Sequence, residues 1–172
     1  MIKRGLYRRV QAFSPFWKIY LDTCCLSRLF DPPTQTRVIE EAKATHQILT
    51  YCFRGDWHWI ASDVIIDEVE QTPDLEERTQ VETLLMLTHQ IISVGAEEIS
   101  RGLQLESLGF KEKDALHLAC AESGEADIFL TTDDRLLRRS QRAQARLHIQ
   151  VENPETWLRE VTGNGHFPDD GS

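Results

Sequence analysis

Residues 113–139 read KDALHLACAESGEADIFLTTDDRLLRR, the most informative segment of the chain for its fold class. The beginning of this segment belongs to a predicted helix over residues 111–123, which Gly124 ends. Residues 128–131 then form a short apolar run, typical of a buried strand, and Asp133 begins a further predicted helix. A helix, a buried strand and another helix in this order indicate an α/β fold.

The rest of the chain continues this alternation of strands and helices. Further strands are predicted over residues 18–22, 57–61, 91–94 and 148–151. A short helix is predicted from Thr23, and a long one from a cap at Thr34 or Thr36 to residue 53. The remaining helices are predicted over residues 63–71, 74–88, 96–108, 133–145 and 154–161. We therefore expect an α/β fold with a central, mostly parallel sheet of about five strands flanked by helices.

The length and composition are those of one domain. The chain has 172 residues, of which 41% are hydrophobic, and this is enough for a single core. We expect a basic N-terminal extension at residues 1–17, the folded domain at 18–162 and a flexible tail at 163–172. The extension lacks the apolar core of a secretory signal. Three interpretations of it stay open: a targeting segment, an arm that binds RNA or a partner, or translated sequence upstream of the true start.

Apolar content, charge and cysteines narrow the function classes. No apolar run approaches the roughly 20 residues that span a bilayer, so we expect a cytoplasmic protein without a membrane partner. The net charge of −9 argues against indiscriminate, tight nucleic-acid binding, because lysine and arginine supply most affinity for phosphate. A nuclease with a carboxylate site remains compatible, because bound cations restore positive charge locally. The cysteines form no Cys-x-x-Cys pair, and we expect buried thiols in a reducing cytosol: Cys24, Cys25, Cys52 and Cys120.

Four acidic residues fall where a parallel sheet would bring them together. Asp22 ends the first predicted strand and Asp133 follows the fourth, so both should lie at the carboxyl edge of the sheet. Glu68 and Asp114 lie on predicted helices within reach of that edge. Each acid alone has an ordinary explanation, as a helix cap, a first-turn acid or part of a solvated face.

The four acids together indicate a metal site. Mg²⁺ and Mn²⁺ prefer oxygen ligands, and carboxylates at close range repel one another until a cation neutralises them. One such cation can activate a water for attack on phosphorus, and a second can stabilise the leaving oxygen. The sequence leaves open whether one or two cations bind.

Three segments resemble the PIN-domain family: IYLDTCCLSRLFD at residues 19–31, ASDVIIDEVEQTPD at residues 61–74, and the segment at residues 113–139 quoted above. The resemblance extends over about residues 18–158 and is strongest to the VapC-type toxins of bacterial toxin–antitoxin pairs. It implies a three-layer PIN-like fold. Two features depart from the pattern: Cys24 stands where many relatives carry Asn or Ser, and the basic N-terminal extension lies outside it. We expect the Cys24 thiol to weaken hydrogen bonding around Asp22.

The resemblance implies both a site and an activity. The four acids of the family fall on Asp22, Glu68, Asp114 and Asp133, and the polar residue that supports the fourth falls on Thr131 or Thr132. Asp133 is preferred over Asp134 because of its spacing from Thr131. The implied activity is Mg²⁺- or Mn²⁺-dependent hydrolysis of RNA phosphodiesters. A small cognate antitoxin and, in many relatives, a homodimer are implied as well.

Residues next to the acids are candidates for supporting roles. Thr23 and the two threonines before Asp133 could hold the ligands, and His117 could either support the site or simply pack at its edge. A helical stripe of arginines could follow an RNA backbone or be an ordinary solvated face: Arg135, Arg138, Arg139, Arg142 and Arg146. Core packing is the expected role of at least one residue of the pair Trp57 and Trp59.

Three functions are compatible with these residues. The first is a toxin ribonuclease kept silent by an antitoxin, and the second is a PIN-fold nuclease of RNA maturation or decay without an antitoxin. The third is a PIN module that binds RNA or protein without cutting. Retention of all four acids favours the first two, because a module without catalysis has no physical need to crowd carboxylates together.

Overall fold

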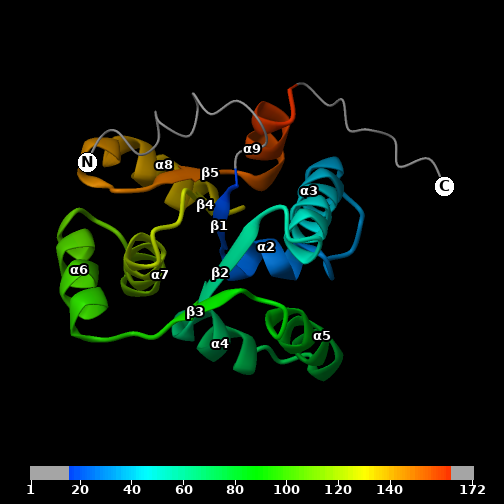
Figure 1. Cartoon of the computed structure of the whole chain (residues 1–172), viewed down its shortest axis with the longest axis horizontal. Helices are drawn as coiled ribbons and strands as arrows, with labels where there is room; N and C mark the ends of the chain where they lie inside the picture. Colours follow the sequence, from blue (N-terminus) through cyan, green and yellow to red (C-terminus); the bar gives the residue numbers. More distant parts are fainter. Residues whose placement is uncertain (1–15, 164–172) are drawn as a thin grey trace.

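A central five-stranded sheet organises the structure, a computed structural model that describes residues 16–163 (Figure 1). The strand order is β3-β2-β1-β4-β5, and every described pairing is parallel. The predicted sheet of five strands is confirmed, and it is fully parallel rather than mostly parallel. The strands are β1 (Lys18–Leu21), β2 (His58–Ser62), β3 (Gln90–Ile92), β4 (Ile128–Leu130) and β5 (Gln150–Glu152).

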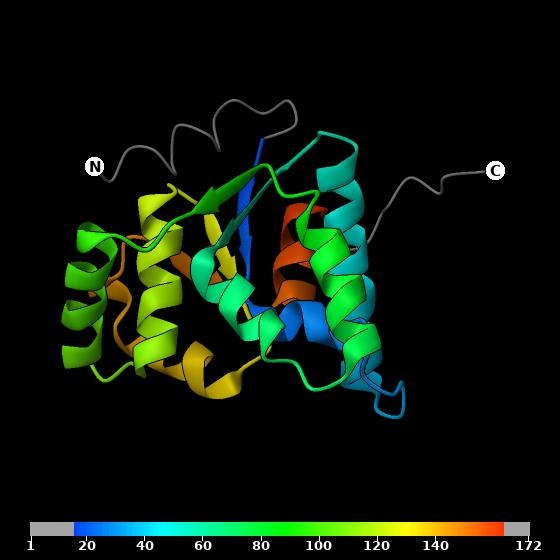
Figure 2. The same ribbon diagram turned by 90° about the horizontal axis from the view of Figure 1, so that it is seen from below.

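Helices cover both faces of the sheet, which gives three layers (Figures 1 and 2). On one face, α7 packs against β2 and β3, and α6 packs against the outer side of α7. On the other face, α3 packs against β2 and α9. The helices are α2 (Thr23–Arg28), α3 (Thr36–Phe53), α4 (Asp63–Glu70), α5 (Leu75–Leu85), α6 (Ala96–Ser107), α7 (Glu112–Ser123), α8 (Asp134–Arg142) and α9 (Pro154–Val161), with a short 3-10 helix, η1, at Gln144–Arg146.

The core lies along the three central strands. β1, β2 and β4 are apolar along nearly their whole length, as expected for strands that helices cover on both faces. The Tyr20 and Phe129 rings stack across the β1–β4 pair with centroids 5.1 Å apart. Trp57 and Trp59 are both buried, which confirms the core role predicted for at least one of them.

Several predicted boundaries are wrong by a few residues, and local hydrogen bonds explain them. β3 ends at Ile92 because the Val94 N–H donates to the Asp63 carboxylate instead of to a neighbouring strand. β5 begins at Gln150 rather than at His148, whose N–H donates to the Glu122 carboxylate. Neither threonine caps α3: the N-cap is Gln35, without a side-chain bond.

Other boundaries shift because helices change geometry near their ends. The helix predicted over residues 74–88 ends at Leu85, and the helix predicted over residues 133–145 ends at Arg142 and continues as η1.

Residues 1–15 of the predicted extension and residues 164–172 of the predicted tail lie outside the described residues. Within residues 16–163, no helix is both long and apolar enough to cross a membrane.

Candidate metal centre

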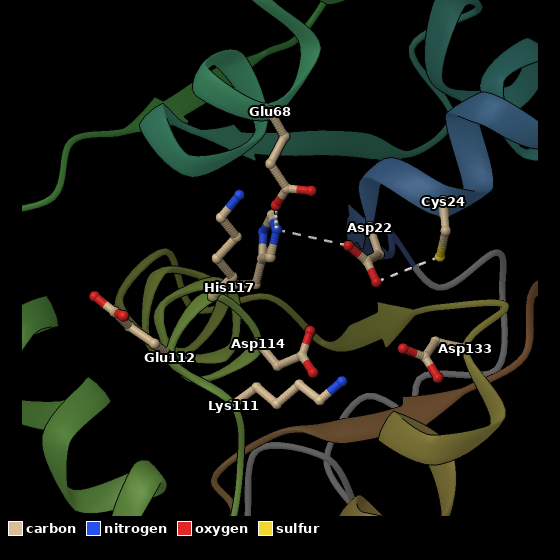
Figure 3. Close-up of a pocket in the computed structure, with 9 residues that line it drawn as sticks. Asp22, Cys24, Glu68, Lys111, Glu112, Asp114, His117 and Asp133 are labelled. Carbon is tan, nitrogen blue, oxygen red and sulfur yellow. Dashed lines mark hydrogen bonds and ion pairs between the residues drawn. The ribbon is translucent and has the colours of Figure 1, made fainter. Parts of the chain in front are cut away.

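The carboxyl edge of the sheet carries a pocket at the point where the strand order reverses. From β1 the chain builds outward to β2 and β3 on one side, and then to β4 and β5 on the other. Ligands of parallel α/β sheets bind at such a reversal. A pocket of about 430 Å³ lies there (Figure 3), and it is lined by Asp22, Cys24, Glu68, Lys111, Glu112, Lys113, Asp114, His117 and Asp133. All four acids predicted from the sequence line this one pocket.

Asp22 directly follows β1 and is held at both carboxylate oxygens. As the N-cap of α2, its Oδ1 accepts a hydrogen bond from the Thr23 backbone N–H at 2.8 Å. Its Oδ2 accepts one from the Thr131 hydroxyl at 2.8 Å and a weaker one from the Cys24 thiol at 3.4 Å. These donors fix the direction of the Asp22 carboxylate at the pocket (Figure 3).

Asp133 comes from the segment that follows β4. Its Oδ1 caps α8 by accepting hydrogen bonds from the N–H groups of Arg135 and Leu136, at 2.9 and 3.3 Å. Its own N–H donates to the Thr131 hydroxyl oxygen at 3.1 Å. Thr131 therefore contacts both acids at the ends of β1 and β4.

The structure distinguishes Asp133 from its neighbour Asp134. Asp134 does not line the pocket, and both of its carboxylate oxygens accept hydrogen bonds from Arg37, at 2.7 and 2.8 Å. Asp133 lines the pocket (Figure 3). The geometry is therefore consistent with the preference for Asp133.

Glu68, on α4, is hydrogen-bonded to a buried histidine. His117, on α7, has its Nε2 bonded to the Glu68 carboxylate and 3.7 Å from Oδ1 of Asp22. Its Nδ1 lies 2.7 Å from the Tyr20 hydroxyl, which in turn lies 2.6 Å from Oγ of Ser62. His117 therefore does more than pack at the edge of the site: it joins a buried hydrogen-bond chain that ends on Glu68.

The electrostatics reflect the crowding of acids. Burial, followed by the nearby charges of Asp22 and Asp133, raises the pKa of Asp114 to about 6. Burial lowers the pKa of His117, but the hydrogen bond that His117 donates to Glu68 and the surrounding carboxylates raise this pKa overall. The crowded carboxylates therefore favour the protonated forms of both Asp114 and His117.

The supporting residues predicted from the sequence contribute unequally. Thr131 contacts Asp22 and Asp133 through its hydroxyl, whereas Thr132 uses its backbone N–H, which donates to the Cys24 sulfur at 3.3 Å. Thr23 also acts through its N–H, and within residues 16–163 its buried hydroxyl has no hydrogen-bond partner.

Cys24 differs from the other cysteines. Cys25, Cys52 and Cys120 are buried, as predicted, but Cys24 is only partly buried and lines the pocket. The expectation that its thiol weakens the bonding around Asp22 finds no support, because Thr131 and the thiol both donate to that carboxylate.

The basic residues that line the pocket are two lysines. Lys111 and Lys113 line it, whereas none of the arginines of α8 does so within the described part of the chain. Arg135, Arg138 and Arg142 are exposed on the helix surface. Lys111 could have been noticed in the sequence, because it lies three residues before Asp114 at the start of a helix.

The carboxylate oxygens at the pocket are the type of ligand that a hard divalent cation prefers. Five carboxylates line the pocket, the four predicted acids and Glu112, and oxygen ligands are what Mg²⁺ and Mn²⁺ prefer. Among residues 16–163, no three His, Cys, Asp or Glu side chains are gathered closely enough to hold one ion as they stand. The acids are spaced around the pocket, and the raised pKa of Asp114 shows that they still act on one another.

Comparison with known proteins agrees with this architecture. No curated protein matches the sequence. A similar solved structure is the crystal structure of VapBC2 from Rickettsia felis bound to a DNA fragment from their promoter. The match has a TM-score of 0.52 and 16% sequence identity, and it covers 79% of this chain and 98% of that chain, which shows a shared fold. The family model described as PIN domain matches residues 19–141, most of the described chain. The chain therefore belongs to the PIN domain family.

Proposed function

We propose that this chain is a Mg²⁺- or Mn²⁺-dependent endoribonuclease. The observation that carries the proposal is that the four predicted acids line one pocket at the strand-order reversal, together with Glu112 and two lysines. PIN domains are generally nucleases, which supports the same reaction class. Carboxylates alone would repel a phosphodiester, so the site needs the positive charge of a cation in order to accept RNA.

In this proposal, Asp22, Glu68, Asp114 and Asp133 hold the metal. A bound divalent cation supplies an activated water and neutralises charge on the reacting phosphate. The Thr131 hydroxyl keeps the Asp22 carboxylate oriented, and the His117 Nε2–H donates to Glu68. Asp114, with a pKa of about 6, is mainly ionised above that pH and is then able to serve as a ligand.

The basic residues bind the substrate. Lys111 and Lys113 line the pocket, and in this proposal they bind phosphates that flank the cleaved bond without reading the base sequence. The arginines of α8, of which Arg139 is partly buried and the others are exposed, extend this role to more distant phosphates of the same RNA: Arg135, Arg138, Arg139 and Arg142.

We further propose that the nuclease is the toxin of a toxin–antitoxin pair. Supporting this is the fold shared with a structure described as VapBC2 bound to promoter DNA. A small cognate antitoxin would bind this chain and block cleavage, and a homodimer is the expected assembly. Induced expression should arrest growth, Asp114→Asn should abolish the arrest, and co-expression of a small neighbouring reading frame should relieve it. Growth arrest that persists in the Asp114→Asn strain would contradict the toxin proposal.

The direct test is cleavage of total cellular RNA by the purified chain with Mg²⁺ or Mn²⁺. Discrete fragments should form, and they should disappear with EDTA and in Glu68→Gln. The matched control is Asp67→Asn, which removes an exposed acid one residue away on the same helix and should leave cleavage intact. Fragments that survive in Glu68→Gln would point to a different site or a contaminant. Absence of cleavage by folded, metal-bound protein would favour a binding module.

A further inference from the structure

Arg37, at the start of α3, has contacts that the proposed metal site does not use. Its guanidinium donates two hydrogen bonds to the two carboxylate oxygens of Asp134, at 2.7 and 2.8 Å. It donates another to the backbone carbonyl of Thr132 at 3.0 Å. Its Nε–H donates to the Glu41 carboxylate at 3.1 Å. Four hydrogen bonds therefore leave this one side chain.

The first three of these bonds end on the two residues that flank Asp133. Thr132 precedes Asp133 and Asp134 follows it, so one guanidinium holds the chain on both sides of this pocket acid. A paired guanidinium–carboxylate contact fixes orientation as well as distance. Arg37 and Asp134 are each about half exposed, with side-chain exposures of 47% and 52%, and such ion pairs add little to global stability. The contact therefore matters mainly through the geometry that it imposes.

The other end of Arg37 is anchored in the protein interior. Glu41 is 2% exposed at its side chain, and its Oε1 also accepts a hydrogen bond from Arg28 at 3.2 Å. Its Oε2 accepts one from the side-chain amide of Asn153 at 2.6 Å. A buried carboxylate with three such donors can barely move, because losing any of them would leave charge uncompensated. Glu41 is therefore held in place by its hydrogen bonds, and it in turn fixes the position of Arg37.

The opposite side of the same segment is tied to β1 and α2. Thr131 donates to Asp22 and accepts from the Asp133 N–H, and the Thr132 N–H donates to the Cys24 sulfur. Residues 131–134 are therefore held from the pocket side by Thr131 and Cys24, and from the α3 side by Arg37. Asp133 lies between these two sets of contacts.

We propose that Arg37 is a positioning residue that holds the Asp133 carboxylate at the pocket, with Glu41 as its anchor. The inference rests on the proposed function, because it takes Asp133 to be a metal ligand. Loss of groups that orient metal ligands typically weakens metal affinity 10–100-fold. Removal of the Arg37 guanidinium should therefore raise the Kd for Mn²⁺ by about tenfold or more while the domain stays folded.

The test is isothermal titration of Mn²⁺ into the full chain, with thermal unfolding to check the fold. Arg37→Gln should raise the Kd about tenfold, and Asp134→Asn, which breaks the same contact from the other side, should raise it similarly. The double variant should be no worse than either single variant, because both remove one interaction. In cleavage assays, saturating Mn²⁺ should largely restore kcat of Arg37→Gln. The matched control is Arg28→Gln, because Arg28 bonds Glu41 and Asp31 but not the segment around Asp133.

Two results would overturn the inference: a wild-type Kd in Arg37→Gln and Asp134→Asn, or an equal loss of affinity in Arg28→Gln. The second result would mean that loss of any nearby arginine weakens binding, and that the contacts of Arg37 with Thr132 and Asp134 have no specific role. Failure of the proposed function would look different, because Asp133→Asn would then bind Mn²⁺ as tightly as the wild type. If Asp133→Asn weakens binding and Arg37→Gln does not, only the positioning role is lost.

Discussion

Replacement of Asp114 by Asn should stabilise the metal-free protein, although it removes a proposed ligand. Asp114 has its pKa raised from 3.8 to about 6, first by burial and then by Asp22 and Asp133. A folded-state pKa above the unfolded value means that stability is present at low pH and is lost as pH rises through about 6. Near neutral pH the charged carboxylate therefore opposes folding.

The magnitude follows from that difference in pKa. A pKa raised from 3.8 to about 6 corresponds to at most about 3 kcal/mol in the free energy of unfolding. Asp114 is only partly buried, and solvent screening reduces this limit to about 1–2 kcal/mol. For a chain of this length, such a gain should raise Tm by roughly 2–8 °C.

Urea unfolding in EDTA, at pH 7.5 and near pH 4, is the assay. At pH 7.5 the free energy of unfolding of Asp114→Asn should be larger than that of the wild type. Near pH 4 this difference should shrink towards zero. Addition of Mn²⁺ should make the wild type the more stable protein, because the ion stabilises the wild type more than the variant that has lost a proposed ligand. As a control, Glu112→Gln removes an exposed acid from the same helix and should change stability by less than about 0.5 kcal/mol. An Asp114→Asn protein less stable than the wild type at pH 7.5, or a gain unchanged near pH 4, would refute the reasoning.

Three further changes test other parts of the structure. Glu41→Ala removes the carboxylate that Arg28, Arg37 and Asn153 share, and it should lower the free energy of urea unfolding by about 3 kcal/mol. A loss below about 1 kcal/mol would mean that Glu41 does not hold these side chains firmly. Tyr20→Phe breaks the hydrogen-bond chain to His117 and should lower the free energy of unfolding by about 1–2 kcal/mol. An unchanged free energy in the same assay would contradict this. Lys111→Ala should raise KM for RNA more than it lowers kcat, and it should reduce the slope of log affinity against log salt by about one. An unaltered salt slope would place the phosphate contacts elsewhere.

The sequence predicted the architecture and the gathering of the acids for one physical reason. Parallel strands end at the same edge, so Asp22 and Asp133 were expected at that edge once their strands were recognised. Glu68 and Asp114 followed from helix positions next to that edge and from the family resemblance. The alternation of buried strands with helices predicted the layers in the same way, although local side-chain bonds moved several boundaries.

The hydrogen-bond pairings around the acids could not be predicted, because the residues that pair lie far apart in the sequence. Arg37 and Asp134 are 97 residues apart, as are Tyr20 and His117. Such pairs depend on which strands are neighbours, and the order β3-β2-β1-β4-β5 does not follow from periodicity. The regular spacing of the arginines on α8 indicated a possible RNA-binding stripe. The lysines at the pocket have no such pattern to separate them from ordinary surface residues.

The pairing of β1 with β4 has a consequence for synthesis of the chain. Thr131 reaches Asp22 across 109 residues, so the pocket forms only after β4 has joined the strand that is made first. Contacts between such distant residues form slowly, because a long loop must close before they are gained. In a chain still growing on the ribosome, Asp22 is therefore without Thr131 and Asp133 until the segment that contains them has been made. The proposed nuclease would become competent only after the segment containing Asp133 had left the ribosome, which delays any cleavage of RNA close to its own place of synthesis.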